Sequence, residues 1–131
     1  MTTAHTVSPQ LKNLAMREAK AFLNELSGIK AVVIATVDGF DIASATTANI
    51  DAARIAAMAS SISAIGAVVA QETALGAASS VVINSAQGFV QVFAVNRQDV
   101  PLIVNIVSDS TGVLAQVAYR GRSIAQTLLT A

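Results

Sequence analysis

The sequence predicts an α+β fold in the order helix, two strands, helix, three strands, helix, with helices on both faces of an antiparallel sheet. Three observations predict it. Apolar residues recur at helical spacing in three segments, and five short segments between them are rich in β-branched residues. The loops that join successive strands are too short for parallel crossovers, so these neighbours run antiparallel. The strands are apolar on both faces, which requires a covering layer above and below the sheet.

The first helix is expected to begin at Ser8 and Pro9, because serine can cap a helix and proline suits its first position. Gly28, just past the apolar stripe, marks its end. The stripe consists of Leu11, Ala15, Ala19, Phe22, Leu23 and Leu26. Residues 1–7 are expected to form a loose tail, and residues 8–131 a single domain.

A hairpin follows, with strands over 29–37 and 40–45. Asp38-Gly39 between them is a strong two-residue hairpin signal. Asp38 and Asp41 could also suggest a metal-binding loop or a pair of carboxylates for acid–base catalysis. They lack the spacing of a calcium loop and flank a turn instead of an evident pocket, so neither kind of site is expected.

The rest of the chain is expected to form one helix, three strands and a last helix. Its elements are a helix over 49–75 with Gly76 as its stop, strands over 80–84, 89–95 and 102–107, and a last helix that runs to about residue 129. Asp109 or Ser110 is expected to cap the last helix. In the strand over 89–95, the two faces carry Phe89, Phe93 and Val95 on one side and Val90, Val92 and Ala94 on the other. The stripe of the last helix is Leu114, Val117, Gly121, Ile124 and Leu128.

Composition excludes several functions. The chain has 131 residues with 8 Lys+Arg and 8 Asp+Glu, so it lacks the positive charge that non-specific nucleic-acid binding requires. It contains no Cys and one His, at position 5, which excludes thiolate metal sites and a multi-histidine site within one chain. Its glycines fit none of the nucleotide-binding spacings. We therefore expect no catalytic residue, no cofactor and no metal site.

The low charge content of the chain points to a covered surface. Charged residues make up 12% of the chain, against roughly 25% in soluble domains, although 53% of the residues are apolar. A domain of this size leaves much of its surface exposed, so part of it is buried against another chain or meets lipid. The uncharged residues 55–71 are shorter than the about 20 apolar residues of a membrane span. We expect a soluble cytoplasmic oligomer with no membrane span.

The second helix carries two lines of residues on opposite sides. The large residues Ile55, Met58, Ile62, Ile65 and Val69 form one line, which is expected to pack on the sheet. The small line opposite consists of Ala53, Ala57, Ser60, Ala64, Ala67 and Gln71. A solvent-facing side would carry Lys and Glu, and high helix propensity alone would not explain their absence. We therefore expect the small line to form a close helix–helix seam with another chain.

The strand over 80–84 is expected to join the same interface. No charged residue lies between Glu72 and Arg97, so this strand, if it is an edge, has no charged gatekeeper. A homodimer that pairs this edge across a two-fold axis, with the second helices packed together, covers both features. The predicted interface residues on the strand are Ser80, Val82 and Asn84.

The order of these features resembles the Roadblock family, which includes Roadblock-type dynein light chains and bacterial MglB-like proteins. The resemblance covers residues from about 8 to 129. It rests on the hairpin over 31–44, the Ala-rich helix after a polar loop, Gly88-Phe89-Val90-Gln91-Val92, and Leu102-Ile103-Val104 leading to Gly112. It implies a Roadblock/profilin-like three-layer sandwich: a five-stranded antiparallel sheet with the second helix on one face and the terminal helices on the other.

The resemblance also implies a function. Members form homodimers with one continuous sheet and bind Ras-like small GTPases (MglA-like) as activating regulators or scaffolds, or serve as adaptor subunits. The family has no shared catalytic residue to carry over. We expect a non-catalytic homodimer from a bacterium or archaeon that regulates a Ras-like small GTPase. A structural adaptor of a kinase or motor assembly and a small-molecule sensor are the alternatives.

Two further groups are candidate contacts. Arg120 and Arg122, beside Tyr119, could contact the partner as an arginine finger or through acidic groups, although such arginines are more often a solvated face. Asp109 and Ser110 could help bind an anion at a helix start, although side-chain capping is their ordinary role.

Overall fold

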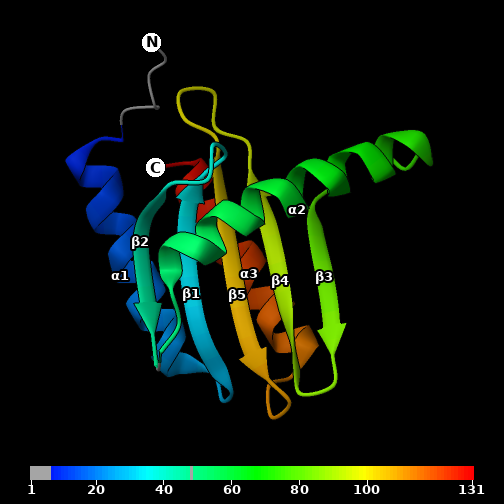
Figure 1. The fold of residues 1–131 in the computed structure, drawn as a ribbon. Coiled ribbons are helices and arrows are strands. Elements are labelled where there is room, and N and C mark those ends of the chain that lie inside the picture. The colour runs from blue at the N-terminus through cyan, green and yellow to red at the C-terminus, as the bar shows by residue number, and fades with distance from the viewer. Residues whose placement is uncertain (1–6, 48) are drawn as a thin grey trace.

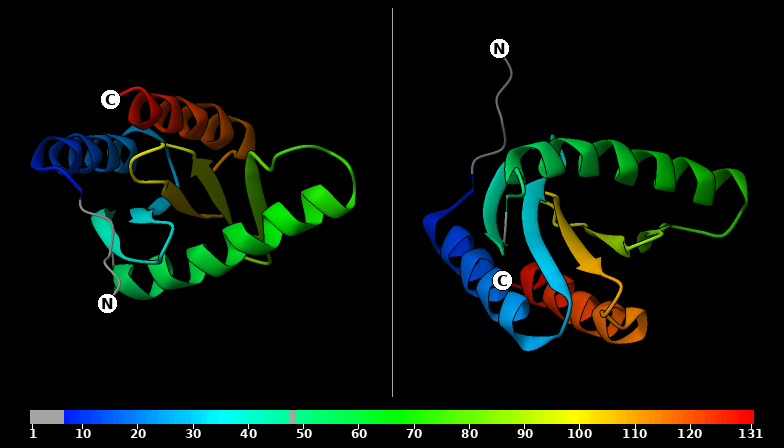
Figure 2. Two further views of the ribbon diagram at one scale, coloured as in Figure 1. Left: turned by 90° about the horizontal axis from the view of Figure 1, so that it is seen from above. Right: turned by 60° about the horizontal axis from the view of Figure 1, so that its bottom comes forward.

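The structure, a computed structural model that describes residues 7–47 and 49–131, has a five-stranded antiparallel sheet between helices (Figure 1). Its elements are α1 (Pro9–Glu25), β1 (Ile29–Thr36), β2 (Asp41–Thr46), α2 (Ala52–Glu72), β3 (Ser80–Ser85), β4 (Gly88–Val95), β5 (Leu102–Asp109) and α3 (Leu114–Leu129). The strands lie in the order β2-β1-β5-β4-β3, and neighbouring strands are antiparallel. α2 crosses one face of the sheet, and α1 and α3 cover the other (Figure 2). The predicted order of elements and the three layers are confirmed.

The start and end of α1 follow the predicted signals. The Leu11 N–H donates to the Ser8 hydroxyl at 3.1 Å, and Pro9 is the first helical residue. Gly28 has a φ of +87°, which glycine adopts without strain. Residues 1–6, with His5, lie outside the described residues. Val7, expected in the tail, packs against the core.

The turn between β1 and β2 is one residue longer than the predicted two-residue hairpin. The Gly39 N–H donates to Thr36 O and the Thr36 N–H donates to Phe40 O, each at 2.9 Å. Gly39 has a φ of +94°, the left-handed conformation that a three-residue hairpin loop needs before its second strand. The turn lies against α2, where the Ser60 hydroxyl donates to Val37 O at 2.7 Å.

The start of α3 differs from the prediction, because neither Asp109 nor Ser110 caps the helix. α3 begins at Leu114 after Val113, which makes no side-chain cap bond. The Asp109 carboxylate instead accepts hydrogen bonds from the N–H and the hydroxyl of Thr111. Aspartate commonly bonds to the backbone two residues ahead, and this local turn competes with a helix start at the same position.

The main core lies between the sheet and the pair α1 and α3. Its largest fully buried side chains include Phe22, Phe93, Ile106, Ile124 and Leu128. Gly121 lets α3 approach β4, because a Cβ at this position would overlap the Phe93 ring. Phe89, Phe93 and Val95 belong to this core, whereas Val90 and Val92 pack on the α2 side. The predicted division of β4 between two covered faces is therefore confirmed for these residues.

The packing of α2 corrects the predicted role of its large residues. Ala56 and Ala59 are its fully buried residues, and they face the sheet with Val33, Val92 and Ile103 as neighbours in two small clusters. Ile55 and Ile62 are half-buried at the same face. Met58, Ile65 and Val69 are 51%, 64% and 56% exposed, so the expectation that the whole large line packs on the sheet is wrong.

Met58 and Ile65 are exposed because α2 packs on the sheet through Ala56 and Ala59, and Val69 is exposed because the helix is longer than the sheet is wide. A helix of 21 residues is about 31 Å long, whereas five strands span about 19 Å between their outermost axes. α2 crosses the sheet diagonally and continues past β3 (Figure 1). Small residues let its first half lie close to the strands, and beyond Gly66 the helix no longer has a strand of its own chain beneath it.

Candidate interaction surface

β3 is an open edge of the sheet. It pairs with β4, and among the described residues no strand lies on its other side. Val82 and Ile83 are 38% and 41% exposed on opposite faces. α3 packs on β4 and β5 and makes no contact with β3. An uncovered, uncharged edge of this kind is a template for pairing with another strand.

The β3–β4 hairpin determines which backbone groups of β3 are open. The Ala94 N–H donates to Ser79 O at 3.4 Å, and Val82 lies directly opposite Gln91. In an antiparallel pair, hydrogen-bonded and non-hydrogen-bonded residues alternate, so residues 79, 81 and 83 turn their backbone groups toward β4. Ser80, Val82 and Asn84 therefore turn theirs outward. These are the three strand residues that the sequence predicted for an interface.

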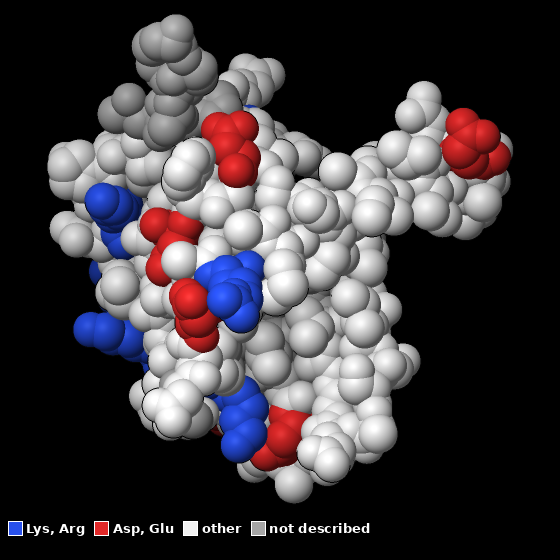
Figure 3. Space-filling view, in the orientation of Figure 1, with Lys and Arg blue, Asp and Glu red and all other residues white. Residues whose placement is uncertain are grey.

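The end of α2 projects beside this edge. We call residues 67–72 the α2 arm. A Cβ at Gly66 would lie 2.5 Å from Val81 Cγ2, so the helix touches β3 here and leaves the sheet immediately afterwards. Val68 and Val69 in the arm are 58% and 56% exposed. Figure 3 shows this side of the molecule as largely uncharged, with an acidic group at the far end of α2, where Glu72 ends the helix.

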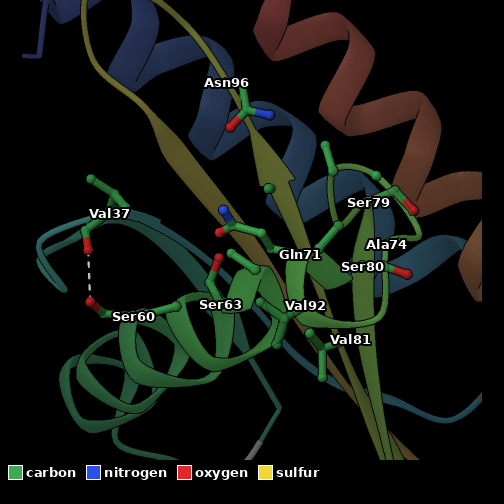
Figure 4. Close-up of a pocket in the computed structure, with 16 residues that line it drawn as sticks. Val37, Ser60, Ser63, Gln71, Ala74, Ser79, Ser80, Val81, Val92 and Asn96 are labelled. Carbon is green, nitrogen blue, oxygen red and sulfur yellow. Dashed lines mark hydrogen bonds between the residues drawn. The ribbon is translucent and has the colours of Figure 1, made fainter. Parts of the chain in front are cut away.

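A cavity of about 700 Å³ separates the second half of α2 from the start of β3. Ser63 and Gln71 point into it from α2, and Asn96 lies at its rim (Figure 4). Of the described residues that line the cavity, none is charged or aromatic. The space exists because alanine, serine and glycine line most of it, so these walls have no large side chains to fill it.

The structure divides the predicted seam of α2 between two environments. Ser60, Ala64, Ala67 and Gln71 line the cavity, and Ala53 and Ala57 are exposed nearer the start of the helix. The opposite flank of α2 carries the exposed large residues Met58, Ile65 and Val69. Sequence reasoning assigned this flank to the core, because periodicity separates the two sides of a helix but does not show which side meets the sheet.

The two candidate arginines have different surroundings. Arg120 lies in an ion-pair cluster with α1: its Nε is 2.9 Å from Glu25 Oε2 and its Nη2 is 3.5 Å from Glu18 Oε1. Its guanidinium also lies 5.8 Å from the centre of the Phe22 ring, within the range of a cation–π contact. Arg122 is exposed. The structure therefore gives Arg120 a role in holding α3 to α1.

Within residues 7–47 and 49–131, no three acidic or histidine side chains lie close enough together to hold a metal ion. Burial raises the pKa of Asp41, and hydrogen bonds from Ser44 and Ala43 partly offset it. Hydrogen bonds from Thr111, with Lys30 nearby, lower the pKa of Asp109. Neither Asp38 nor Asp41 lines the cavity under α2 or the smaller one beside Tyr119 and Arg120. The open edge and the exposed flank of α2 are therefore the features that a function must explain.

Comparison with known proteins identifies the family. The family model of the Roadblock/LC7 domain matches residues 17–100, more than half of the chain. The chain belongs to the Roadblock/LC7 family. Among curated proteins, no sequence matches this Roadblock/LC7 chain.

Solved structures confirm the fold of this Roadblock/LC7 protein. A structure described as MglB with a tetrameric arrangement has a TM-score of 0.83 and 17% identity, covering 99% of this chain and 96% of that one. The gliding protein MglB of Thermus thermophilus has a TM-score of 0.82 and 13% identity, with the same coverage. MglB of Myxococcus xanthus has a TM-score of 0.73 and 16% identity, covering 99% of this chain and 92% of that one.

Proposed function

We propose that this Roadblock/LC7 protein is a non-catalytic, cytoplasmic homodimer that regulates a Ras-like small GTPase. The family membership and the likeness to MglB structures support a regulator. The observation that carries the dimer is the uncharged surface made by the β3 edge and the exposed flank of α2. Exposed apolar surface of this extent is uncommon on a monomer.

The proposed mechanism is positional. GTPases change activity through switch segments that order and disorder. A rigid dimer surface, built on a sheet and helices, can bind one arrangement of these segments and thereby shift its population. Arg122 is the exposed arginine that could contact acidic groups of the partner, whereas Arg120 already has two carboxylate partners within the chain.

The apolar character of α2 also fits a second explanation, a membrane-spanning helix. By length and composition α2 could cross a membrane, and little of its apolar surface is buried within the chain. However, Ala56 and Ala59 are fully buried against strands, and Ser60 bonds to the β1–β2 turn. Extraction of α2 would uncover the face of the sheet that contains Val33 and Ile103. We therefore propose that a second protein chain covers α2.

Single-turnover hydrolysis of GTP by the cognate GTPase, with and without this protein, tests the proposal. A faster rate, with complex formation, supports a regulator that activates the GTPase. Complex formation at an unchanged rate would favour a structural adaptor. Arg122→Ala tests the contact of the exposed arginine, with Lys12→Ala on α1 as a charge-matched control. Absence of any complex would contradict the GTPase assignment.

A small-molecule sensor is favoured by one observation, the cavity under α2. Its volume of about 700 Å³ lies within the range of roughly 300–1,000 Å³ for small-molecule sites. Its lining lacks the aromatic residues that such sites commonly contain. A thermal-shift screen with uncharged metabolites tests this alternative, and Ala67→Leu, which reduces the cavity, is the matched variant.

A further inference from the structure

We propose that α2 opens from the sheet as a unit while the sheet, α1 and α3 stay folded, and that the buried amide of Asn105 sets how easily it opens. The opening is a property of a single chain. Because α2 carries the exposed flank on which the proposed function depends, its opening gives the chain a means of regulating that surface. This regulatory consequence rests on the proposed function, whereas the opening itself does not.

α2 is the longest helix of the chain, but it buries the smallest side chains. Its two buried residues are both alanines. The buried residues of α1 include Leu11 and Phe22, and those of α3 include Ile124 and Leu128. Burial of an apolar side chain stabilises a contact roughly in proportion to the area removed from water, and the alanine side chain supplies little area. Local opening is easiest where such contacts are few, so α2 is the helix that separates from the sheet most easily.

Asn105 lies at the centre of the sheet face that α2 covers. It belongs to β5, the middle strand, and is directly opposite Val33 of β1 and Val92 of β4. Both valines face α2, because Val33 packs with Ala56 and Val92 packs with Ala59. Directly opposite residues of an antiparallel sheet share a face, so Asn105 faces α2 between the two valines. The apolar contacts beneath α2 form two small clusters, one on each side of this amide.

The amide of Asn105 opposes the closed position of α2. Asn105 is 2% exposed, and its Oδ1 has no hydrogen-bond partner among residues 7–47 and 49–131. A buried amide oxygen of this kind has lost its hydrogen bonds to water and has gained none in return, which destabilises the state in which it is buried. When α2 opens, water reaches the oxygen and this loss is recovered. The side chain of Asn105 therefore shifts the equilibrium toward the open position.

The connection from α2 to β3 allows the helix to move. Residues 73–79 form this connection, and all of them except Ala78 are exposed. A Cβ at Gly76 would have no atom within 4 Å, and the cavity separates the second half of α2 from the start of β3. A connecting segment without close neighbours can change its backbone angles when the helix moves. Displacement of α2 can therefore occur while β3 remains paired with β4.

Thiol labelling of two single-cysteine variants tests the opening, because the chain contains no Cys. Val32 and Val33 are neighbours on β1 and are each 0% exposed, but Val33 lies beneath α2 and Val32 belongs to the main core on the other face. We expect Val33→Cys to be labelled at least about 10-fold faster than Val32→Cys. Urea unfolding of both variants gives the contribution of global unfolding. Equal labelling rates at equal global stability would overturn the proposed opening.

Asn105→Leu, introduced into Val33→Cys, tests the role of the amide. Leucine has a similar branched shape and no polar atom, so loss of the unpartnered oxygen is expected to slow the labelling by about 5- to 150-fold. Asn105→Val, with a smaller side chain, checks that crowding beneath α2 does not hide the effect. Unchanged or faster labelling in both variants would overturn the role of Asn105, because the amide would then stabilise the closed position.

Gln91→Leu in the same background is the matched control. Gln91, like Asn105, is a buried amide whose oxygen has no partner in the described part of the chain. It lies on the opposite face, because it is two residues from Phe89 and Phe93 of the main core. Opening of α2 leaves that face covered, so we expect this variant to leave the labelling of Val33→Cys unchanged, whatever its effect on urea unfolding. A change in labelling that matches the change in global stability would contradict a separate opening of α2.

The cognate GTPase separates this inference from the proposed function. A partner that binds α2 in its closed position is expected to slow the labelling of Val33→Cys, and unchanged labelling in the complex would show that the opening does not regulate this surface. Faster labelling of Val33→Cys than of Val32→Cys, in a chain that binds no GTPase, supports the opening and contradicts the proposed function. Equal labelling in a chain that binds the GTPase contradicts the opening and retains the proposed function. Light scattering at the labelling concentration checks that all variants have the same mass.

Discussion

Replacement of Ile65 by Arg is expected to dissociate the proposed dimer without unfolding the chain. Ile65 is 64% exposed in the single chain, so its substitution is expected to change the free energy of unfolding of the monomer by no more than about 0.5 kcal/mol. Complete burial of an isoleucine side chain contributes about 1.5–3 kcal/mol. Burial of the exposed two-thirds in a dimer would therefore contribute about 1–2 kcal/mol per copy.

Because a two-fold interface contains the residue twice, Ile65→Arg would remove about 2–4 kcal/mol of dimer stability. The dissociation constant is then expected to rise by roughly 30- to 1,000-fold. Sedimentation or light scattering over a dilution series measures this constant, and circular dichroism checks that the monomer remains folded.

Ala64→Arg is the matched control, because it adds the same charge one residue away but on the cavity side of α2. We expect this variant to retain the dimer. If Ala64→Arg dissociates the dimer and Ile65→Arg does not, the small line forms the seam, as the sequence predicts, and the assignment of the large flank is refuted. If neither variant alters the mass, α2 does not contribute to the interface.

Three further predictions concern the fold that supports this surface. Gly121→Ala is expected to destabilise the chain by about 1–2 kcal/mol in urea unfolding, because overlap with Phe93 outweighs the better helix propensity of alanine; no loss would show that α3 can move away from β4. Hydrogen bonds from Thr111 lower the pKa of Asp109 in the folded chain. The stability that these bonds contribute is therefore present above the pKa of Asp109 in the unfolded chain, and it is lost as the pH falls through the pKa in the folded chain. Thr111→Val is expected to reduce this loss, measured as the decrease in the free energy of unfolding between about pH 5 and pH 2. The same decrease in the variant and the unmodified chain would contradict the role of Thr111. Arg120→Met should lower the melting temperature more than Arg122→Met, because Arg120 bonds to Glu18 and Glu25; equal effects would argue against the cluster.

The sequence predicted the elements well because their signals are local. Ser8-Pro9 and Gly28 delimit α1 through a cap, a fixed φ and a left-handed residue, and none of these depends on the rest of the chain. The two apolar faces of β4 predicted helices on both sides of the sheet. The start of α3 was missed because Asp109 can cap a helix or close a turn with Thr111, and the sequence does not distinguish these local bonds.

The assignment of the two lines on α2 could not be made from the sequence. Periodicity shows that large and small residues occupy opposite sides of a helix, but not which side meets the sheet. The usual rule, that large apolar residues are buried, failed for Met58, Ile65 and Val69. The helix packs through Ala56 and Ala59, which let its axis approach the strands closely.

By itself, the sequence determined that the chain forms helices and strands in this order. It also showed that the chain has too few charged residues for its whole surface to face water. The tertiary structure decided where the uncharged surface lies. It made β3 an edge, extended α2 beyond that edge, and placed Ser80, Val82 and Asn84 with their backbone groups outward. The physical reason is that helix and strand signals act over a few residues, whereas exposure depends on which elements become neighbours and how far each extends past the other.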